Sequence, residues 1–282
     1  MKLPSIDIPR TIRLIQDFIQ VRVNEAEAEG VIIGLSGGID SAVVTKLAIN
    51  ALGSGNVHVL FLPSASTPKS DLDDVTQFCA ELGLIPTILD IQKIIETYSS
   101  IIREPEQSSR LEWMNLKPRI RQSIEYFYAN RLNCLVCGTG NKSELMIGYF
   151  TKYGDGAADI LPIGDVYKTH VYQLGEALEV PQNILKKVPS AGLTEGQTDE
   201  EEIGISYRNL DLILSGLERF QTPGEVSANL GLDIAEIKKV EGMLYRSEHK
   251  RRGPIVFKIG VRTPHHDWRI PLVPPNRLEK IK

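Results

Sequence analysis

The sequence predicts an α/β protein with a doubly wound, mostly parallel sheet, helices on both of its faces, and a helical C-terminal part. Over the first half of the chain, short β-branched apolar runs alternate with amphipathic segments of helical spacing. Glycine-rich turns follow two of these runs, where a parallel sheet presents the carboxyl ends of its strands. Alternation of this kind gives right-handed crossovers and a Rossmann-like topology.

The first elements follow from the spacing of apolar residues. A helix over residues 8–28 is predicted by isoleucines that recur three or four positions apart, at Ile8, Ile12, Ile15 and Ile19. A buried strand over residues 31–35 follows, and then a second helix. The next elements are expected to be a strand over 57–62, a helix over 71–82 and a strand over 84–89.

In the second half of the chain, we expect helices over 91–98 and 119–130, a strand over 134–137, a strand-to-helix turn over 138–141 and a surface loop over 189–202. Between the two helices lies a polar, proline-containing stretch, around residues 104–116, which predicts an exposed excursion. After Val171 the periodicity is mostly helical.

Composition and charge are those of an ordinary folded globular protein. The 282 residues are 42% hydrophobic and 24% charged, which excludes disordered, collagen-like and coiled-coil classes. We expect one domain over residues 1–282, with an α/β core and helical additions in 8–249 and a basic, proline-rich tail in 250–282. The net charge of -4 disfavours nucleic acid as a partner, and no apolar run predicts a membrane span. Three cysteines fit the reducing cytoplasm.

The most informative motif lies between the first predicted strand and the helix after it. It reads Gly34-Leu35-Ser36-Gly37-Gly38-Ile39-Asp40-Ser41. The glycines allow backbone N–H groups to close on an anion, the helix adds the positive end of its dipole, and the serine hydroxyls add donors. The motif matches neither GxxxxGK[ST] nor GxGxxG, which disfavours ordinary NTPase and dinucleotide-fingerprint chemistry. It therefore predicts a phosphate-binding loop of another kind.

Asp40 is the unexpected member of this loop. A carboxylate repels phosphate oxygens unless a divalent cation stands between them, so we interpret Asp40 as a ligand of Mg²⁺. The alternative interpretation is a glycine-rich turn in which Asp40 and Ser41 only cap the following helix.

The SGGxDS segment, residues 36–41, resembles the pyrophosphate loop of the N-type ATP pyrophosphatases, which cleave ATP between its α and β phosphates. This resemblance alone implies the half-reaction and leaves the acceptor open. Further motifs resemble those of NAD synthetases in the same order: residues 138–144, residues 148–156 with Asp159, Lys168 with the residues after it, residues 189–193, residues 197–200 and residues 249–251. The chain thus resembles the NAD synthetase family over about residues 12–268.

The resemblance implies that ATP and ammonia convert deamido-NAD to NAD through an adenylated nicotinate, with release of AMP and pyrophosphate. It places ATP on Gly34, Leu35, Ser36, Gly37, Gly38, Ile39, Asp40, Ser41, Thr139, Lys168 and Ser190. Mg²⁺ is expected on Asp40 and Glu144, and Asp40 and Lys168 are the expected catalytic residues. Deamido-NAD is expected on Arg119, Lys152, Asp159, His249 and Lys250. The family also implies a homodimer, and the 104–116 excursion is where we expect its interface.

Several alternatives accompany this interpretation. A related ligase would act on another acceptor, such as a nucleobase or tRNA, and a nucleotide sensor would bind ATP without turnover. We expect Cys134 and Cys137 to be buried packing residues, because no second CxxC or His pair lies at a zinc-ligand spacing. Arg121 is expected to point away from the phosphates. The acids of residues 199–202 are expected to form the first turn of a helix.

Overall fold

The computed structural model describes residues 2–107, 110–190, 198–264, 267–270 and 272. Over these residues a parallel sheet has the strand order β3-β2-β1-β4, with bounds Thr87–Ile88, Val57–Phe61, Gly30–Gly34 and Cys134–Val136. The register pairs Ile32 with both His58 and Val136. All four strands run in the same direction, so the turn after each one opens at the same edge of the sheet. The predicted doubly wound α/β fold is confirmed.

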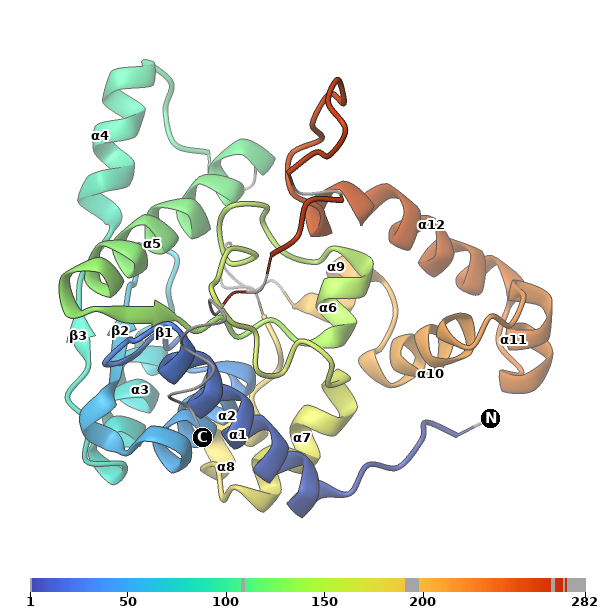
Figure 1. Ribbon diagram of the computed structural model, residues 1–282, viewed down its shortest axis with the longest axis horizontal. Coiled ribbons are helices and arrows are strands. Elements are labelled where there is room, and N and C mark those ends of the chain that lie inside the picture. Colours follow the sequence, from blue (N-terminus) through green and yellow to red (C-terminus); the bar gives the residue numbers. More distant parts are fainter. Residues whose placement is uncertain (1, 108–109, 191–197, 265–266, 271, 273–282) are drawn as a thin grey trace.

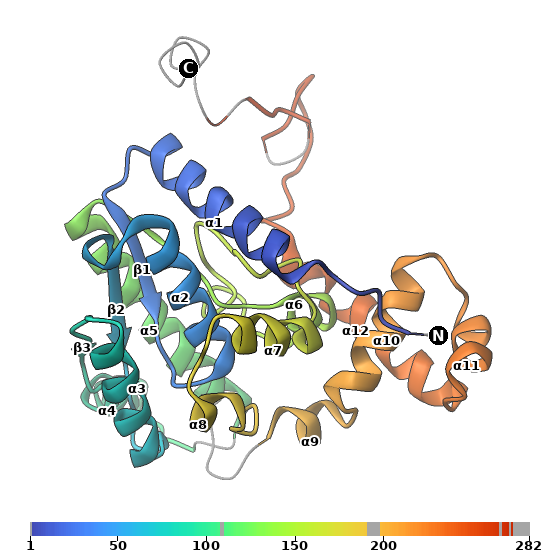
Figure 2. The ribbon, with the colours of Figure 1, turned by 90° about the horizontal axis from the view of Figure 1, so that it is seen from below.

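Helices cover both faces of the sheet (Figures 1 and 2). One face packs against α1 (Ile8–Glu25), α2 (Ile39–Leu52), α3 (Lys69–Glu81) and α7 (Lys168–Ala177). The other face packs against α4 (Gln92–Ile102) and α5 (Leu111–Leu132). Consecutive residues of β1 serve the two layers, since Ile32 faces α4 and α5 while Ile33 belongs to the core of the first face. Burial on both faces explains why the strand is a continuous apolar run.

A second hydrophobic core lies beside the sheet, in the helical C-terminal part (Figure 2). It is built by α6 (Lys142–Ile147), α9 (Asp199–Ile203), α10 (Tyr207–Glu218), α11 (Pro223–Leu230) and α12 (Ile234–Arg251). Leu210, Ile213 and Leu214 of α10 lie at its centre and are fully buried. The short helix α8 (Gln182–Leu185) packs in the sheet layer, since Ile184 and Leu185 belong to the core of its first face. The expected helical C-terminal part is therefore present.

Two element boundaries differ from the sequence-based expectation. The strand predicted over residues 84–89 is reduced to β3 (Thr87–Ile88), because Pro86 has no N–H to donate and the strand lies at the sheet edge. Helix α5 begins at Leu111 and not at 119, so the second half of the expected excursion is helical. Pro118 is tolerated inside this helix because Trp113, which is 3% exposed, anchors its first turns to the core.

Candidate active site

The turn between β1 and α2 is held by hydrogen bonds between its own residues. The backbone N–H of Gly38 donates to Ser36 Oγ at 3.2 Å, and that of Ser36 donates to Ser41 Oγ at 3.2 Å. Ser41 Oγ in turn donates to the carbonyl of Gly38 at 3.0 Å. The turn feeds directly into the N-terminus of α2, whose first N–H groups have no partner within the helix. Its shape is thus set before any anion binds.

Two glycines of this turn are required by geometry. Gly37 has a φ of 80°, in the left-handed region that favours glycine. Gly34 ends β1, and a Cβ there would lie 2.4 Å from Oε1 of Glu125 on α5. Gly37 is thus needed for the left-handed backbone of the turn, whereas Gly34 makes room for a carboxylate of the protein itself.

A buried lysine joins two carboxylates at the start of α2 and α6. The ammonium of Lys168 donates to Asp40 Oδ2 and lies 3.4 Å from Glu144 Oε1. Lys168 is 2% exposed, and although burial by itself lowers its pKa, the charges of Asp40 and Glu144 raise the pKa above its usual range. Burial, and next the charge of Asp40, raise the pKa of Glu144. With two carboxylates and one ammonium, this cluster therefore has an excess of negative charge.

Local structure explains how Glu144 reaches this cluster. Asn141 caps α6: its side chain accepts from the N–H of Glu144 at 3.1 Å, and its own N–H donates to Glu144 Oε2 at 3.2 Å. The Asn141 side-chain amide also donates to Asp40 Oδ1 at 3.0 Å. This hydrogen bond thus links the turn before α6 to the turn before α2.

Asp199 adds a third acid to the same wall of the cavity. It is 4% exposed and accepts from the hydroxyls of Tyr207 at 3.0 Å and Tyr149 at 3.2 Å. Burial raises its pKa, and the Lys168 charge opposes that effect. Asp199 is in the first turn of α9, as expected for residues 199–202, but its side chain faces the cavity. An acidic run gave no signal of which acid would be buried.

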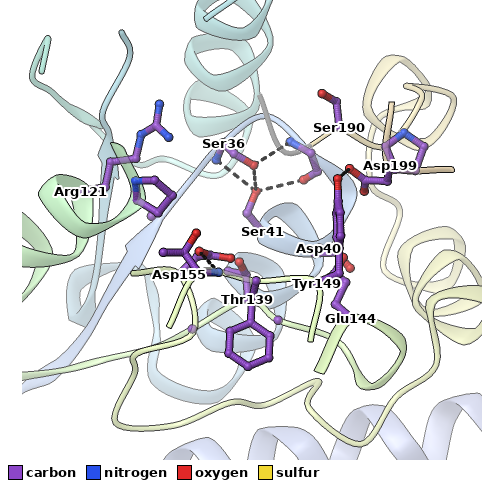
Figure 3. Close-up of a pocket in the computed structure, with 18 of the residues that line it drawn as sticks. Ser36, Asp40, Ser41, Arg121, Thr139, Glu144, Tyr149, Asp155, Ser190 and Asp199 are labelled. Carbon is purple, nitrogen blue, oxygen red and sulfur yellow. Dashed lines mark hydrogen bonds between the residues drawn. The ribbon is translucent and has the colours of Figure 1, made fainter. Parts of the chain in front are cut away.

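The opposite wall holds two oppositely charged side chains of α5, Arg121 and Glu125, of which Arg121 is labelled in Figure 3. The guanidinium Nε of Arg121 donates to the carbonyl of Leu62 at 2.9 Å. One turn further along α5, burial raises the pKa of Glu125 to about 7, against the lowering effect of the Arg121 charge. Arg121 and Glu125 both line the cavity, and the bond from Arg121 to a backbone carbonyl is compatible with the structural role expected of this arginine.

These groups surround one cavity of about 440 Å³. Ser36 and Ser41 lie at its centre, with Arg121 and Asp155 to one side and Asp40, Glu144 and Asp199 to the other (Figure 3). The cavity opens at the carboxyl edge of the sheet, where open α/β folds bind ligands. Its volume is that of a pocket for one small-molecule ligand.

Comparison with known proteins decides the family. Residues 11–254 match the family described as NAD synthase. The chain belongs to the NAD synthase family. The family that the sequence motifs resembled is therefore confirmed, and the protein is an enzyme of the ligase class.

Curated relatives and solved structures agree with this assignment. The NH(3)-dependent NAD(+) synthetase of Archaeoglobus fulgidus is 44% identical over 255 residues, which cover 90% of this chain and 98% of that protein. The solved NMN synthetase from Francisella tularensis is 33% identical with a TM-score of 0.80, covering 90% of this chain and 100% of its own. The NH3-dependent NAD synthetase from Campylobacter jejuni is also 33% identical, with a TM-score of 0.76 and the same coverage.

The residues expected to bind ATP lie together in this NAD synthase. We call them the ATP side: Gly34, Leu35, Ser36, Gly37, Gly38, Ile39, Asp40, Ser41, Thr139, Lys168 and Ser190. All of them except Gly37 line the cavity. Gly37 lies directly behind the lining residues, in the turn that they form.

The residues expected to bind deamido-NAD are arranged differently. We call them the deamido-NAD side: Arg119, Lys152, Asp159, His249 and Lys250. Lys250 lines the cavity and donates to the carbonyls of Gly148 and Phe150, each at 2.7 Å. The other four are not among the lining residues that the structure describes.

Three of these residues nevertheless meet outside the cavity. Lys152 Nζ donates to the carbonyl of His249 at 2.6 Å, and Arg119 Nε donates to the carbonyl of Lys152 at 3.3 Å. Asp159 lies apart from them, where it accepts from the N–H of Val136 at 2.7 Å. The deamido-NAD side is thus a surface that begins at Lys250 and continues away from the cavity.

Other expectations concern metals, cysteines and membranes. Across the described residues, no group of three or more His, Cys, Asp or Glu side chains is arranged to hold a metal ion. Cys134 and Cys137 are free and buried, as expected for packing residues. No helix in the described part of the chain is both long and apolar enough to cross a membrane. The loop expected over residues 189–202 lies partly outside the described residues.

Proposed function

We propose that the protein converts deamido-NAD to NAD, consuming ATP and ammonia and releasing AMP and pyrophosphate. One observation carries the proposal: a preformed phosphate-binding turn meets the Asp40–Lys168–Glu144 cluster in a single cavity of an NAD synthase. Relatives that share more than two-fifths of their residues with this chain are named NH(3)-dependent NAD(+) synthetases, which supports both the acceptor and the nitrogen donor.

In the first half-reaction, a carboxylate oxygen of the nicotinate attacks the α-phosphorus of ATP. The bond between that phosphorus and the bridging oxygen breaks, and pyrophosphate leaves with the electron pair. The N–H groups at the start of α2 and the hydroxyls of Ser36 and Ser41 donate to phosphate oxygens. Lys168 holds its positive charge beside them, because the two acids keep it protonated. Fixed donors of this kind stabilise the developing charge without reorganising.

The residues at this cluster also fit Mg²⁺. Asp40 and Glu144 are close enough to share one cation, the Lys168 ammonium, and both present the hard carboxylate oxygens that Mg²⁺ prefers. The raised pKa of Glu144 indicates that its charge is undercompensated in the protein alone. We propose that Asp40 and Glu144 hold Mg²⁺, which when bound neutralises phosphate charge.

In the second half-reaction, ammonia attacks the carbonyl carbon of the acyl-adenylate. The carbon–oxygen bond to AMP breaks, and the nitrogen loses a proton to give the amide. Splitting the reaction in two supplies a good leaving group where the free carboxylate has none.

We further propose that deamido-NAD binds across Arg119, Lys152, Asp159, His249 and Lys250. Cationic side chains suit the two phosphates and the free carboxylate of this dinucleotide. The cavity has room for one ligand, so a dinucleotide bound together with ATP must extend over the surface beyond Lys250. The meeting of Arg119, Lys152 and His249 at that surface supports this placement.

A homodimer and a cytoplasmic location complete the proposal. We place the interface at the end of α4 and the start of α5, where Ile101 and Leu111 are 74% and 69% exposed. The three free cysteines fit a reducing compartment. Residues 1–282 would then act as one domain in each protomer.

The test is a single assay with purified protein, Mg²⁺, ATP and deamido-NAD, with either ammonium or glutamine as the nitrogen source. We expect NAD, AMP and pyrophosphate in equal amounts with ammonium. AMP and pyrophosphate that never appear with deamido-NAD would overturn the acceptor. ATP that binds without being cleaved would indicate a sensor.

A second candidate function is NMN synthesis, because the solved NMN synthetase from Francisella tularensis superposes with a TM-score of 0.80. The same assay with nicotinate mononucleotide in place of deamido-NAD separates the two. We expect the larger kcat/KM with deamido-NAD, since the deamido-NAD side continues beyond the cavity. A larger kcat/KM for the mononucleotide would favour the second candidate.

A further inference from the structure

Lys187 is a cation of the cavity that the motif comparison leaves without a function. It follows α8 and lines the cavity. Its ammonium lies over the phosphate-binding turn, because a Cβ added to Gly37 would be 3.5 Å from Lys187 Nζ. The backbone carbonyl of Asp71 and Cγ2 of Val75 lie at similar distances, 3.5 and 3.6 Å, so Lys187 stands where α3 approaches the turn.

Two acids of α3 hold the lysine in this position. Lys187 Nζ lies 2.7 Å from Asp71 Oδ1 and 3.0 Å from Asp74 Oδ2. Asp74 is itself fixed by the side-chain amide of Asn183, which donates to it at 2.7 Å. Burial alone lowers the pKa of Lys187, but its hydrogen bonds to the two acids raise it, so the side chain carries a full charge.

The other cations that line the described cavity are committed elsewhere. Lys168 lies between Asp40 and Glu144, and Arg121 is bonded to the Leu62 carbonyl at the opposite wall. Lys250 is bonded to two backbone carbonyls. Lys187, like Lys168, is held by two acids, but it is the lining cation that lies beside Gly37 of the phosphate-binding turn.

Lys187 also has the freedom to move onto a ligand. Its side chain is 28% exposed, whereas that of Lys168 is 2% exposed. A partly exposed ion pair is weak, and the four-carbon stem of lysine reorients easily. A phosphate bound at the turn would compete with Asp71 and Asp74 for the Lys187 ammonium. The ammonium can then transfer its hydrogen bonds from the carboxylates to the phosphate.

We propose that Lys187 binds the β- and γ-phosphates of ATP and neutralises them as they leave as pyrophosphate, and that Asp71 and Asp74 hold its ammonium until ATP binds and compete with the phosphates for it. The proposal rests on the proposed function for the identity of the leaving group. While the carboxylate oxygen–phosphorus bond forms and the phosphorus–oxygen bond to the β-phosphate breaks, the electron pair passes to pyrophosphate. Lys187 supplies charge to that product and transfers no proton.

The first experiment measures binding of Mg²⁺–pyrophosphate to the full chain by calorimetry, without any acceptor. Lys187→Met is expected to weaken binding roughly 10- to 100-fold, the range for a hydrogen bond to a charged group. Lys186→Met is the matched control, because Lys186 is the exposed neighbour, and it should stay within about twofold. Lys187→Arg should restore part of the affinity. A folded Lys187→Met protein that binds pyrophosphate like the wild type would overturn the proposal.

The second experiment tests the two acids with an effect of opposite sign. Asp74→Asn removes one competitor for Lys187, so pyrophosphate should bind a few times more tightly than to the wild type. A purely structural lysine, one that only ties α8 to α3, predicts unchanged or weaker binding in Asp74→Asn together with a lower melting temperature. That result would overturn the proposal.

These readouts separate the proposal from the proposed function. Pyrophosphate binding does not depend on the acceptor, so a wild type that binds pyrophosphate through Lys187 but makes no NAD refutes only the proposed function. In the full reaction, Lys187→Met should lower kcat/KM for ATP by a factor similar to its loss of pyrophosphate affinity, with KM for deamido-NAD unchanged. A rise confined to KM for deamido-NAD would contradict the assignment to the leaving group.

Discussion

On the ATP side of the site, residues 34–41 are consecutive and turn from a strand into a helix, whereas on the deamido-NAD side Arg119, Lys152 and His249 come from α5, from the loop after α6 and from α12. The first group is shaped by hydrogen bonds within five residues of one another. The second is brought together by side chains that reach the backbone of distant segments. A local motif thus builds the turn of the ATP side, whereas tertiary packing brings Lys168 to that turn and builds the deamido-NAD side.

The largest effect is expected from Asp40→Asn. The Asp40 carboxylate accepts hydrogen bonds from Lys168 and Asn141 and is a proposed ligand of Mg²⁺. Its neutral replacement should lower kcat by roughly 100- to 1,000-fold, which is the effect of removing a fixed group that stabilises charge in the transition state. Rates of NAD formation at saturating substrate concentrations measure this fall in kcat. Asp73→Asn, at an exposed position of α3, is the control and should keep full activity. Near-normal turnover in Asp40→Asn would show that the ATP side works without this cluster.

The sequence predicts the local part of the site but not the part that depends on tertiary packing. The turn at residues 34–41 and the Asn141–Glu144 capping box are local, and their residue types alone indicate their geometry. Lys187 and Asp199 carried no such signal. Lys187 meets Asp71 across 116 positions of the chain, and Asp199 is one acid of four whose burial depends on Tyr149 and Tyr207.

The same limit applies to the fold. Strand and helix order followed from periodicity, because each buried stripe repeats within a few residues. The start of α5 did not, since Pro118 disfavours helix locally and the burial of Trp113 overrides it. The packing of α5 also decides which of its arginines faces the cavity: Arg121 is among the lining residues and Arg119 is not.

The next effect concerns Glu125, which lies against the ATP side but comes from α5. Its pKa in the folded protein, about 7, is above the ordinary value of 4.5. The protonated form is therefore the stabilising one: this stability is fully present below about pH 4.5 and is lost as the pH rises through about 7. The loss can reach about 3 kcal/mol for a shift of this size.

Glu125→Gln keeps the shape of the protonated acid, so it should remove this part of the pH dependence. Urea unfolding between about pH 5 and pH 8 measures the change. The exposed Glu96 supplies the control, and Glu96→Gln should follow the wild-type curve. If Glu125→Gln also follows that curve, the charge of Arg121 fully compensates the carboxylate.

A smaller effect is expected on the deamido-NAD side. Arg119→Ala and Lys152→Ala each remove one cation from an exposed surface, so each should raise KM for deamido-NAD about tenfold and leave KM for ATP within about twofold. Steady-state kinetics with each substrate varied in turn separates the two constants. The exposed Arg131, at the far end of α5, provides the control variant Arg131→Ala. Equal rises in both KM values would show that the two sides do not bind separate substrates.

The smallest effect is expected from His249→Ala. Lys152 bonds to the main-chain carbonyl of His249, and alanine keeps that carbonyl, so α12 should still hold the lysine in place. We expect KM for deamido-NAD to change by no more than about threefold, the loss of one weak neutral contact. The comparison with Lys152→Ala is the informative one, because both residues belong to the same surface. A tenfold rise of KM for deamido-NAD in His249→Ala would mean that the imidazole itself contacts the dinucleotide. The contacts of the deamido-NAD side would then come from side chains, whereas the turn of the ATP side offers backbone N–H groups.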